Sequence, residues 1–113
     1  MDVFEALAAP TRRDIVELLA LKGRMAASDI YAQFDASPPA ISQHLKVLRE
    51  AKLVRVERLG QLRIYQIDPQ GMDQIEKWSQ RMTRLWNKRF DALEKVLESE
   101  KEKLKANAKK ERK

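Results

Sequence analysis

Apolar residues recur at helical spacing in three segments of the N-terminal third of the chain. The segments lie at about residues 3–7, 11–22 and 27–34. Their apolar positions are Val3, Phe4, Leu7, Ile15, Leu18, Leu19, Ile30 and Phe34. Thr11 and Asp14 have the spacing of a capping box, so we expect the second helix to begin at Thr11. The pattern predicts three short helices.

A fourth helix is predicted over residues 37–50, directly after a tight turn. Ser37 is a good N-cap, and Pro38 suits the first helical position, where no N–H is needed. The positions spaced for one buried face are Ile41, Leu45 and Leu48. The opposite face is polar and basic and carries Pro39, Ala40, Ser42, Gln43, Lys46 and Arg49. Two helices joined by a short turn, the second basic on its outer face, are typical of a helix-turn-helix.

Two further patterns follow in the second half of the chain. Residues 53–58 and 62–67 are rich in Val, Ile, Leu and Tyr on either side of a turn at Gly60, which predicts a β-hairpin. A long helix then begins at Asp68-Pro69. Its apolar residues recur with a period near 3.5 at Met72, Ile75, Trp78, Met82, Leu85, Trp86, Phe90, Leu93, Val96 and Leu97.

This stripe over residues 72–97 is large for a chain of 113 residues. A core of that size has little room for two Trp, a Phe and two Met on one terminal helix. We therefore predict that the stripe serves a dimer interface, with purely internal packing as the alternative. The fold class is mainly α with a small β-hairpin, in one domain over residues 1–97.

The net charge of +6 is concentrated in two segments. Residues 37–67 carry six basic against two acidic side chains, and residues 98–113 carry seven against four. A basic segment inside an otherwise balanced domain favours a polyanionic partner. The C-terminal segment is a charged, basic tail that we expect to be frayed or disordered.

The chemistry of the side chains excludes several classes of function. There is no cysteine, which excludes disulfides, thiol catalysis and Cys-ligated zinc, and the single His44 cannot build a zinc site or a triad. No apolar run approaches the roughly 18 residues of a membrane helix, and the N-terminus lacks a signal-peptide pattern. We expect a cytoplasmic protein without cofactor, metal site, membrane partner or enzymatic activity.

Two separated motifs resemble the ArsR family of bacterial transcriptional repressors. SPPAISQHLKVL at residues 37–48 has the family's recognition-helix form, S-x-x-x-[VI]-S-x-H-L-x-x-L, and a short link into the hairpin follows it. LAAPTRRDIVELL at residues 7–19 is similar to the family's second-helix signature. The likeness covers residues 3 to about 97 and implies a winged helix-turn-helix, with four helices, a two-stranded wing and a long last helix.

The resemblance implies a homodimer that binds a palindromic operator on double-stranded DNA and represses transcription, including that of its own gene. Helix 37–50 and wing 54–67 would contact the DNA. The residues expected there are Ser37, Pro39, Ala40, Ser42, Gln43, His44, Lys46, Arg58, Gln61 and Arg63. The residues expected in the dimer interface are Phe4, Leu7, Trp78, Met82, Leu85, Trp86, Phe90 and Leu93. For Gln43 the chemistry agrees independently, because its amide can pair with N6 and N7 of adenine.

The chain departs from the family's metal sensors. Some relatives bind metal through Cys on the helix before the recognition helix, and residues 26–32 have none here. Others use paired Asp and His on the last helix, which has no His in this chain. We therefore expect a regulator that does not sense metal. The alternative from another class is a winged helix that binds a protein partner and has only non-specific affinity for DNA.

Overall fold

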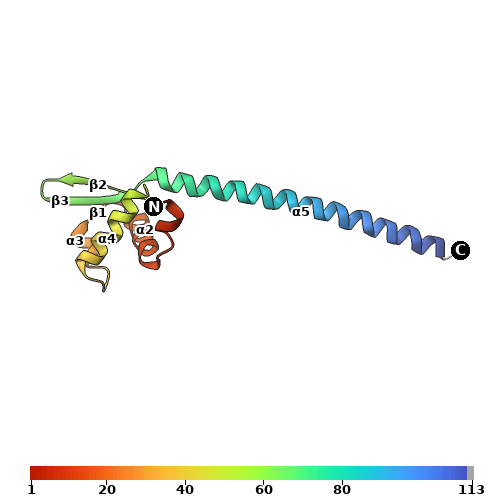
Figure 1. Cartoon of the computed structure of the whole chain (residues 1–113), viewed down its shortest axis with the longest axis horizontal. Coiled ribbons are helices and arrows are strands. Elements are labelled where there is room, and N and C mark those ends of the chain that lie inside the picture. Colours follow the sequence, from red (N-terminus) through yellow and green to blue (C-terminus); the bar gives the residue numbers. More distant parts are fainter. Residues whose placement is uncertain (112–113) are drawn as a thin grey trace. The chain divides into compact units, whose positions relative to one another are not determined.

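The computed structural model describes the backbone of residues 1–111 and the side chains of residues 1–108. Two compact units, Met1–Glu76 and Lys77–Lys113, divide the chain. Figure 1 traces the order of the elements. They are α1 (Val3–Ala6), α2 (Pro10–Lys22), β1 (Met25–Ala26), α3 (Ala27–Tyr31), α4 (Pro38–Glu50), β2 (Val54–Leu59), β3 (Leu62–Ile67) and α5 (Pro69–Glu111).

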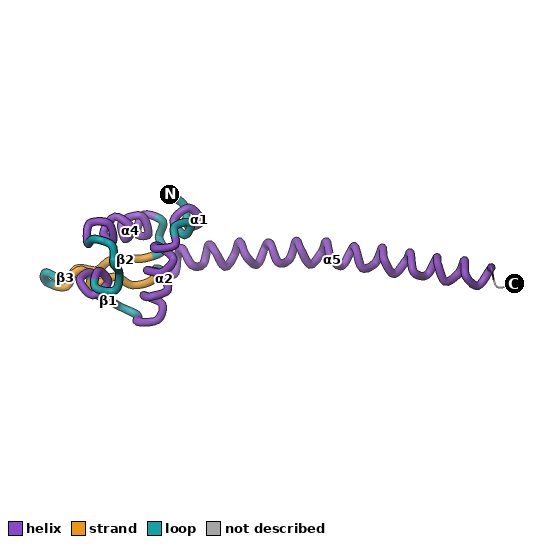
Figure 2. The backbone as a smooth tube through the Cα atoms, turned by 90° about the horizontal axis from the view of Figure 1, so that it is seen from below, coloured by secondary structure: helices purple, strands orange, loops and turns teal. Residues whose placement is uncertain are grey.

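The core of the first unit lies between helices α2, α3 and α4 and a small sheet (Figures 1 and 2). The side chains that are at most 1% exposed include Ile15, Leu19, Ile30, Ile41, Leu45, Leu48 and Leu53. This confirms the buried face predicted for the fourth helix. Phe34 is half-buried against the core, whereas Phe4 is 44% exposed.

The capping residues predicted from the sequence are correct for α4 but not for α2. The Ser37 hydroxyl accepts a 3.4 Å hydrogen bond from the N–H of Ala40, and Pro38 stands at the first helical position, as predicted. The prediction for α2 is wrong, because its N-cap is Ala9, without a side-chain bond, and not Thr11. Pro10 begins this helix because its fixed φ suits the first turn and it has no N–H to satisfy.

The sheet has three antiparallel strands in the order β1-β3-β2, where the sequence predicts only the two strands of the hairpin. Met25 and Ala26 pair with Tyr65 and Ile64. A strand of two residues is too short for its alternation to be seen in a sequence. In the hairpin the inward residues are Val54, Val56, Tyr65 and Ile67, all buried or packed against the core. The wing is thus anchored on the helices at its base.

The link between α4 and β2 is packed closely against the start of α5. Lys52 has a positive φ of 63°, and its carbonyl accepts a 2.8 Å hydrogen bond from the N–H of Gly71. Gly71 is buried, and a Cβ there would lie 2.8 Å from the carbonyl carbon of Lys52 and 3.0 Å from Cδ2 of Leu53. Glycine is required at this position because the backbones approach so closely.

Helix α5 continues to Glu111, beyond the end expected near Leu97. The structure differs here from the expected frayed or disordered tail over residues 98–111, and residues 112–113 lie outside the described part. After Leu97 the residues are mostly Glu, Lys and Ala, which are strong helix formers, and Glu100 lies 3.6 Å from Lys103 in an i,i+3 ion pair. Within residues 1–108, no helix has the length and apolarity needed to span a membrane.

Candidate nucleic-acid interface

Helix α4 presents the face predicted to read DNA. Because Ile41, Leu45 and Leu48 are fully buried, the rotation of the helix about its axis is fixed. The solvent side carries Pro39, Gln43, Lys46 and Arg49, which are exposed, and Ala40 and Ser42, which are half-buried. Gln43 and Lys46 are three residues apart and share one surface. An amide and an ammonium group therefore stand together on a rigid, outward-facing helix.

His44 has a partner that the sequence did not reveal. Its Nδ1 lies 3.3 Å from Nη1 of Arg12, which belongs to α2. Arg12 also donates from Nε to the carbonyl of Ala6 at 2.6 Å and from Nη2 to the carbonyl of Glu5 at 3.3 Å. Because a guanidinium can only donate, Nδ1 of His44 is the acceptor and Nε2 carries the ring proton. Arg12 thus ties α1 and α2 to the recognition helix.

The tip of the wing carries two arginines directly opposite each other. Arg58 on β2 pairs in register with Arg63 on β3, and both are exposed. Like charges at directly opposed positions destabilise a hairpin. Within residues 1–108 no carboxylate lies within 4 Å of either guanidinium. The turn between the strands has Gly60 at φ 63° and an exposed Gln61.

A basic cleft joins the wing to the recognition helix. Arg49, near the end of α4, lines it together with Val56, Arg58 and Arg63, around an open volume of about 370 Å³. The sequence places Arg49 on the polar face of the helix, but Arg49 is not among the residues that the resemblance predicts to contact DNA. Its spacing of three from Lys46 is the signal that could have included it. Three guanidiniums around one cleft form a site suited to a phosphate oxygen.

The opposite face of the wing is electrostatically different. Glu57 accepts a 3.0 Å salt bridge from Arg24, in the loop after α2. The two side chains are 51% and 56% exposed, so the pair contributes little to stability. Because side chains alternate along β2, the wing's one acidic residue lies on the face away from Arg58 and Arg63. The positive potential therefore remains on the side of the recognition helix.

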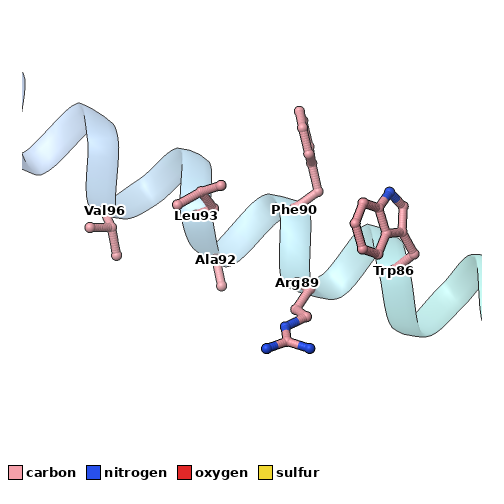
Figure 3. Close-up of a pocket in the computed structure, with 6 residues that line it drawn as sticks. All are labelled: Trp86, Arg89, Phe90, Ala92, Leu93 and Val96. Carbon is pink, nitrogen blue, oxygen red and sulfur yellow. The ribbon is translucent and has the colours of Figure 1, made fainter.

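The residues expected in the dimer interface are distributed over both units. In the first unit Phe4 is exposed and Leu7 packs partly against the core. In the second unit the stripe of α5 is open to solvent, with Trp86 69% exposed and Phe90 53% exposed. Figure 3 shows the side chains of Trp86 and Phe90 extending from the same side of the helix. Both side chains line a pocket on this helix.

Residues 7–57 match the model of a helix-turn-helix domain family. The HTH-type transcriptional regulator Rv2034 of Mycobacterium tuberculosis is 38% identical over 97 residues, which cover 86% of this chain and 87% of that protein. The transcriptional repressor SdpR of Bacillus subtilis is 38% identical over 77 residues, which cover 68% of this chain and 84% of that protein.

Solved structures show the same fold. An ArsR-like transcriptional regulator from Rhodococcus sp. RHA1 has a TM-score of 0.72 at 26% identity and covers 83% of this chain and 88% of that one. This chain belongs to the ArsR family of transcriptional regulators. A further solved structure, described as a possible transcriptional regulator for arsenical resistance, is 43% identical with a TM-score of 0.67, covering 73% of this chain and 84% of that one.

Membership of the ArsR family confirms two predictions from the sequence. The fold is a winged helix-turn-helix, mainly α with a small antiparallel sheet. The protein is a DNA-binding transcriptional regulator and not an enzyme. The individual DNA contacts and the dimer interface stay predictions. Among residues 1–108, no three His, Cys, Asp or Glu side chains gather where they could hold a metal ion.

Proposed function

We propose that this ArsR-family protein is a homodimeric repressor that binds a palindromic operator, including one at its own promoter. Helix α4 enters the major groove, where Gln43 and Lys46 contact base edges, while Arg58, Gln61 and Arg63 of the wing contact the backbone or the adjacent minor groove. The observation that carries this proposal is the basic cleft beside the exposed face of α4. A phosphate in the cleft would relieve the repulsion between the opposed arginines.

The start of the recognition helix adds a weaker contribution. Helix N-termini attract phosphate through unpaired N–H groups, but Pro38 and Pro39 have none. Ser37 uses its hydroxyl to cap the N–H of Ala40. We therefore assign Ser37, Pro39 and Ala40 mainly to shape contacts with the groove, and His44 to positioning of α4 through Arg12.

The homodimer is supported by the exposed stripe of α5, and the two-fold axis of such a dimer implies half-sites about 10 bp apart. Independence from metal is supported by the donor chemistry. The chain has no thiol, and Nδ1 of its single histidine already accepts from Arg12. The carboxylates of the last helix alone are poor ligands for a transition metal.

Fluorescence-anisotropy titration tests the proposal directly. The labelled duplex comes from upstream of the protein's own gene, and a scrambled duplex competes at near-physiological salt, with and without a chelator. We expect tight, selective binding that the chelator does not change. Weak binding that fails to distinguish the two sequences would favour the alternative, a protein-interaction module. The observation behind that alternative is a pair of half-exposed leucines, Leu59 and Leu62, at the tip of the wing.

Replacing Gln43 with alanine is expected to relax specificity at one base position in each half-site. Loss of a bidentate amide contact removes about 1–3 kcal/mol of discrimination against the wrong base. The measurement is the affinity for a set of operators with single-base changes. Gln74→Ala, at an exposed glutamine early in α5, is the matched control and should leave the profile unchanged. A Gln43→Ala profile identical to the wild type would exclude base recognition by this residue.

Replacing Arg63 with alanine is expected to weaken operator and scrambled DNA alike. The logarithm of the binding constant falls linearly with the logarithm of the salt concentration, and each lost phosphate contact makes this negative slope shallower by about one unit. Titrations at several salt concentrations measure that slope. Arg55→Ala, on the other face of the same hairpin, is the control and should change it less. If the two variants lose affinity and slope equally, the contact is not confined to the cleft.

A further inference from the structure

A second opening lies beside the wing, between α3 and the turn of the hairpin. β1 ends opposite Ile64, and the chain then enters α3 at Ala27. The part of β3 nearer the turn therefore has α3 beside it, and a pocket of about 290 Å³ lies between them. We call this the α3–wing pocket. Its lining includes Ala27, Ser28 and Tyr31 from α3 and Gln61, Leu62 and Arg63 from the end of the hairpin.

The side chains around the α3–wing pocket suit a small carboxylate. Arg63 is the one charged residue among those that line it, all of which belong to the described part of the chain. A guanidinium binds a carboxylate through two parallel hydrogen bonds. The hydroxyls of Ser28 and Tyr31 can donate to the same oxygens, and Ala27 and Leu62 are apolar walls for the rest of the ligand. The volume is near the lower end of small-molecule sites, about 300 Å³, so the ligand is small.

Arg63 belongs to two sites at once. It lines the α3–wing pocket, and it lines the basic cleft together with Arg49 and Arg58. Its side chain is exposed, and no carboxylate within residues 1–108 forms an ion pair with it. A carboxylate bound in the pocket would neutralise the guanidinium and occupy its hydrogen-bond donors. The attraction of the cleft for a DNA phosphate would then fall.

We propose that the α3–wing pocket is an effector site, which binds a small monocarboxylate that competes with a DNA phosphate for Arg63. The proposal rests on the proposed function and adds its regulation. Because the two sites share one side chain, the ligand weakens DNA binding, and DNA weakens ligand binding by the same factor. The apolar walls favour an organic acid over inorganic phosphate.

Sodium benzoate is the probe, because it joins one carboxylate to a small apolar ring, and neutral benzamide is its control. A chemical-shift titration of the isotope-labelled, full-length protein without DNA measures the affinity and locates the site. Ser28→Leu fills the pocket and keeps Arg63. Ala20→Leu introduces the same residue at an exposed position of α2, outside the pocket, and is the matched control.

We expect benzoate to shift the resonances of α3 and of the hairpin tip, with a dissociation constant in the millimolar range. Benzamide, which has no charge, should bind at least about tenfold more weakly than benzoate. Ser28→Leu and Arg63→Ala should lose benzoate binding to at least the same extent, whereas Ala20→Leu should bind it as the wild type does.

Anisotropy titrations of the operator in benzoate, compared with an equal concentration of chloride, test the competition. Benzoate should weaken operator binding by the wild type and by Ala20→Leu severalfold, and make the negative salt slope shallower by about one unit. Ser28→Leu should bind the operator as the wild type does in chloride, and benzoate should not weaken that binding. Arg63→Ala should likewise show no further loss in benzoate.

The outcomes separate the pocket, the competition and the proposed function. An absence of shifts, or shifts that persist in Ser28→Leu, would overturn the effector site and leave the proposed operator binding intact. Benzoate bound in the pocket without an effect on operator affinity would overturn the competition for Arg63. A wild-type protein that fails to select the operator in chloride alone would refute the proposed function and its regulation, whereas the titration without DNA still decides whether the pocket binds a carboxylate.

Discussion

Replacing Trp86 with glutamate is expected to convert the protein to a monomer and to abolish selective binding of the operator. Trp86 is 69% exposed in the single chain and lies near the middle of the stripe, so a second copy would bury it. Removing a buried Trp costs about 3–5 kcal/mol, and a two-fold interface contains it twice. An unpaired carboxylate in its place adds a desolvation cost. We expect the dimer dissociation constant to rise at least about a thousandfold.

Sedimentation and anisotropy measure the two parts of this prediction on the same sample. Asn87→Glu introduces the same charge at the next residue, outside the apolar stripe, and should leave both the dimer and the affinity nearly unchanged. Circular dichroism should show the same helix content in both variants. A Trp86→Glu protein that still sediments as a dimer would place the interface elsewhere on the molecule.

Replacing Gly71 with alanine is expected to destabilise the winged-helix unit by about 3 kcal/mol. The added methyl group would clash with the carbonyl group of Lys52. The backbone of the link at Lys52 and Leu53 has little freedom to move away. Leu53 on the same link donates its N–H to the carbonyl of Leu48 at 3.0 Å and accepts from the N–H of Asp68 at 2.9 Å. The loss is large relative to the 5–15 kcal/mol typical of a whole domain.

Urea denaturation followed by circular dichroism gives the free energy of unfolding. Gln70→Ala changes the preceding, exposed residue to the same amino acid and should alter stability by less than about 0.5 kcal/mol. An equally small effect of Gly71→Ala would mean that the link between α4 and β2 can move away from the added methyl group without a loss in the free energy of unfolding.

The recognition helix could be predicted closely because every signal for it is local. Ser37 and Pro38 define its start, and three leucine and isoleucine positions define its buried face. The third strand could not be predicted, because Met25 and Ala26 pair with residues about 40 positions away and show no pattern of their own. The predicted end of α5, near Leu97, is too early. That boundary followed the last closely spaced apolar residues and did not take account of the high helix propensity of Lys, Glu and Ala after them.

The candidate site shows the same division. The register that opposes Arg58 to Arg63 follows from the short turn at Gly60, so the sequence was enough to place both on the wing. The cleft that adds Arg49 depends on how the wing packs against α4, which only the tertiary structure gives. Arg12 was missed for the same reason, because it reaches a histidine 32 residues away.

The side chain of Arg12 has a mechanical consequence for recognition. It bonds to the carbonyls at the end of α1 and to the ring on α4, so the first helix and the recognition helix cannot rotate independently without breaking these bonds. In a dimer with α1 in its interface, the distance between the two recognition helices is then set when the two copies associate. If this spacing differs from the spacing of the half-sites, the DNA must bend or twist to compensate. The stiffness of the DNA between the two half-sites, which depends on its sequence, then contributes to the specificity of the protein.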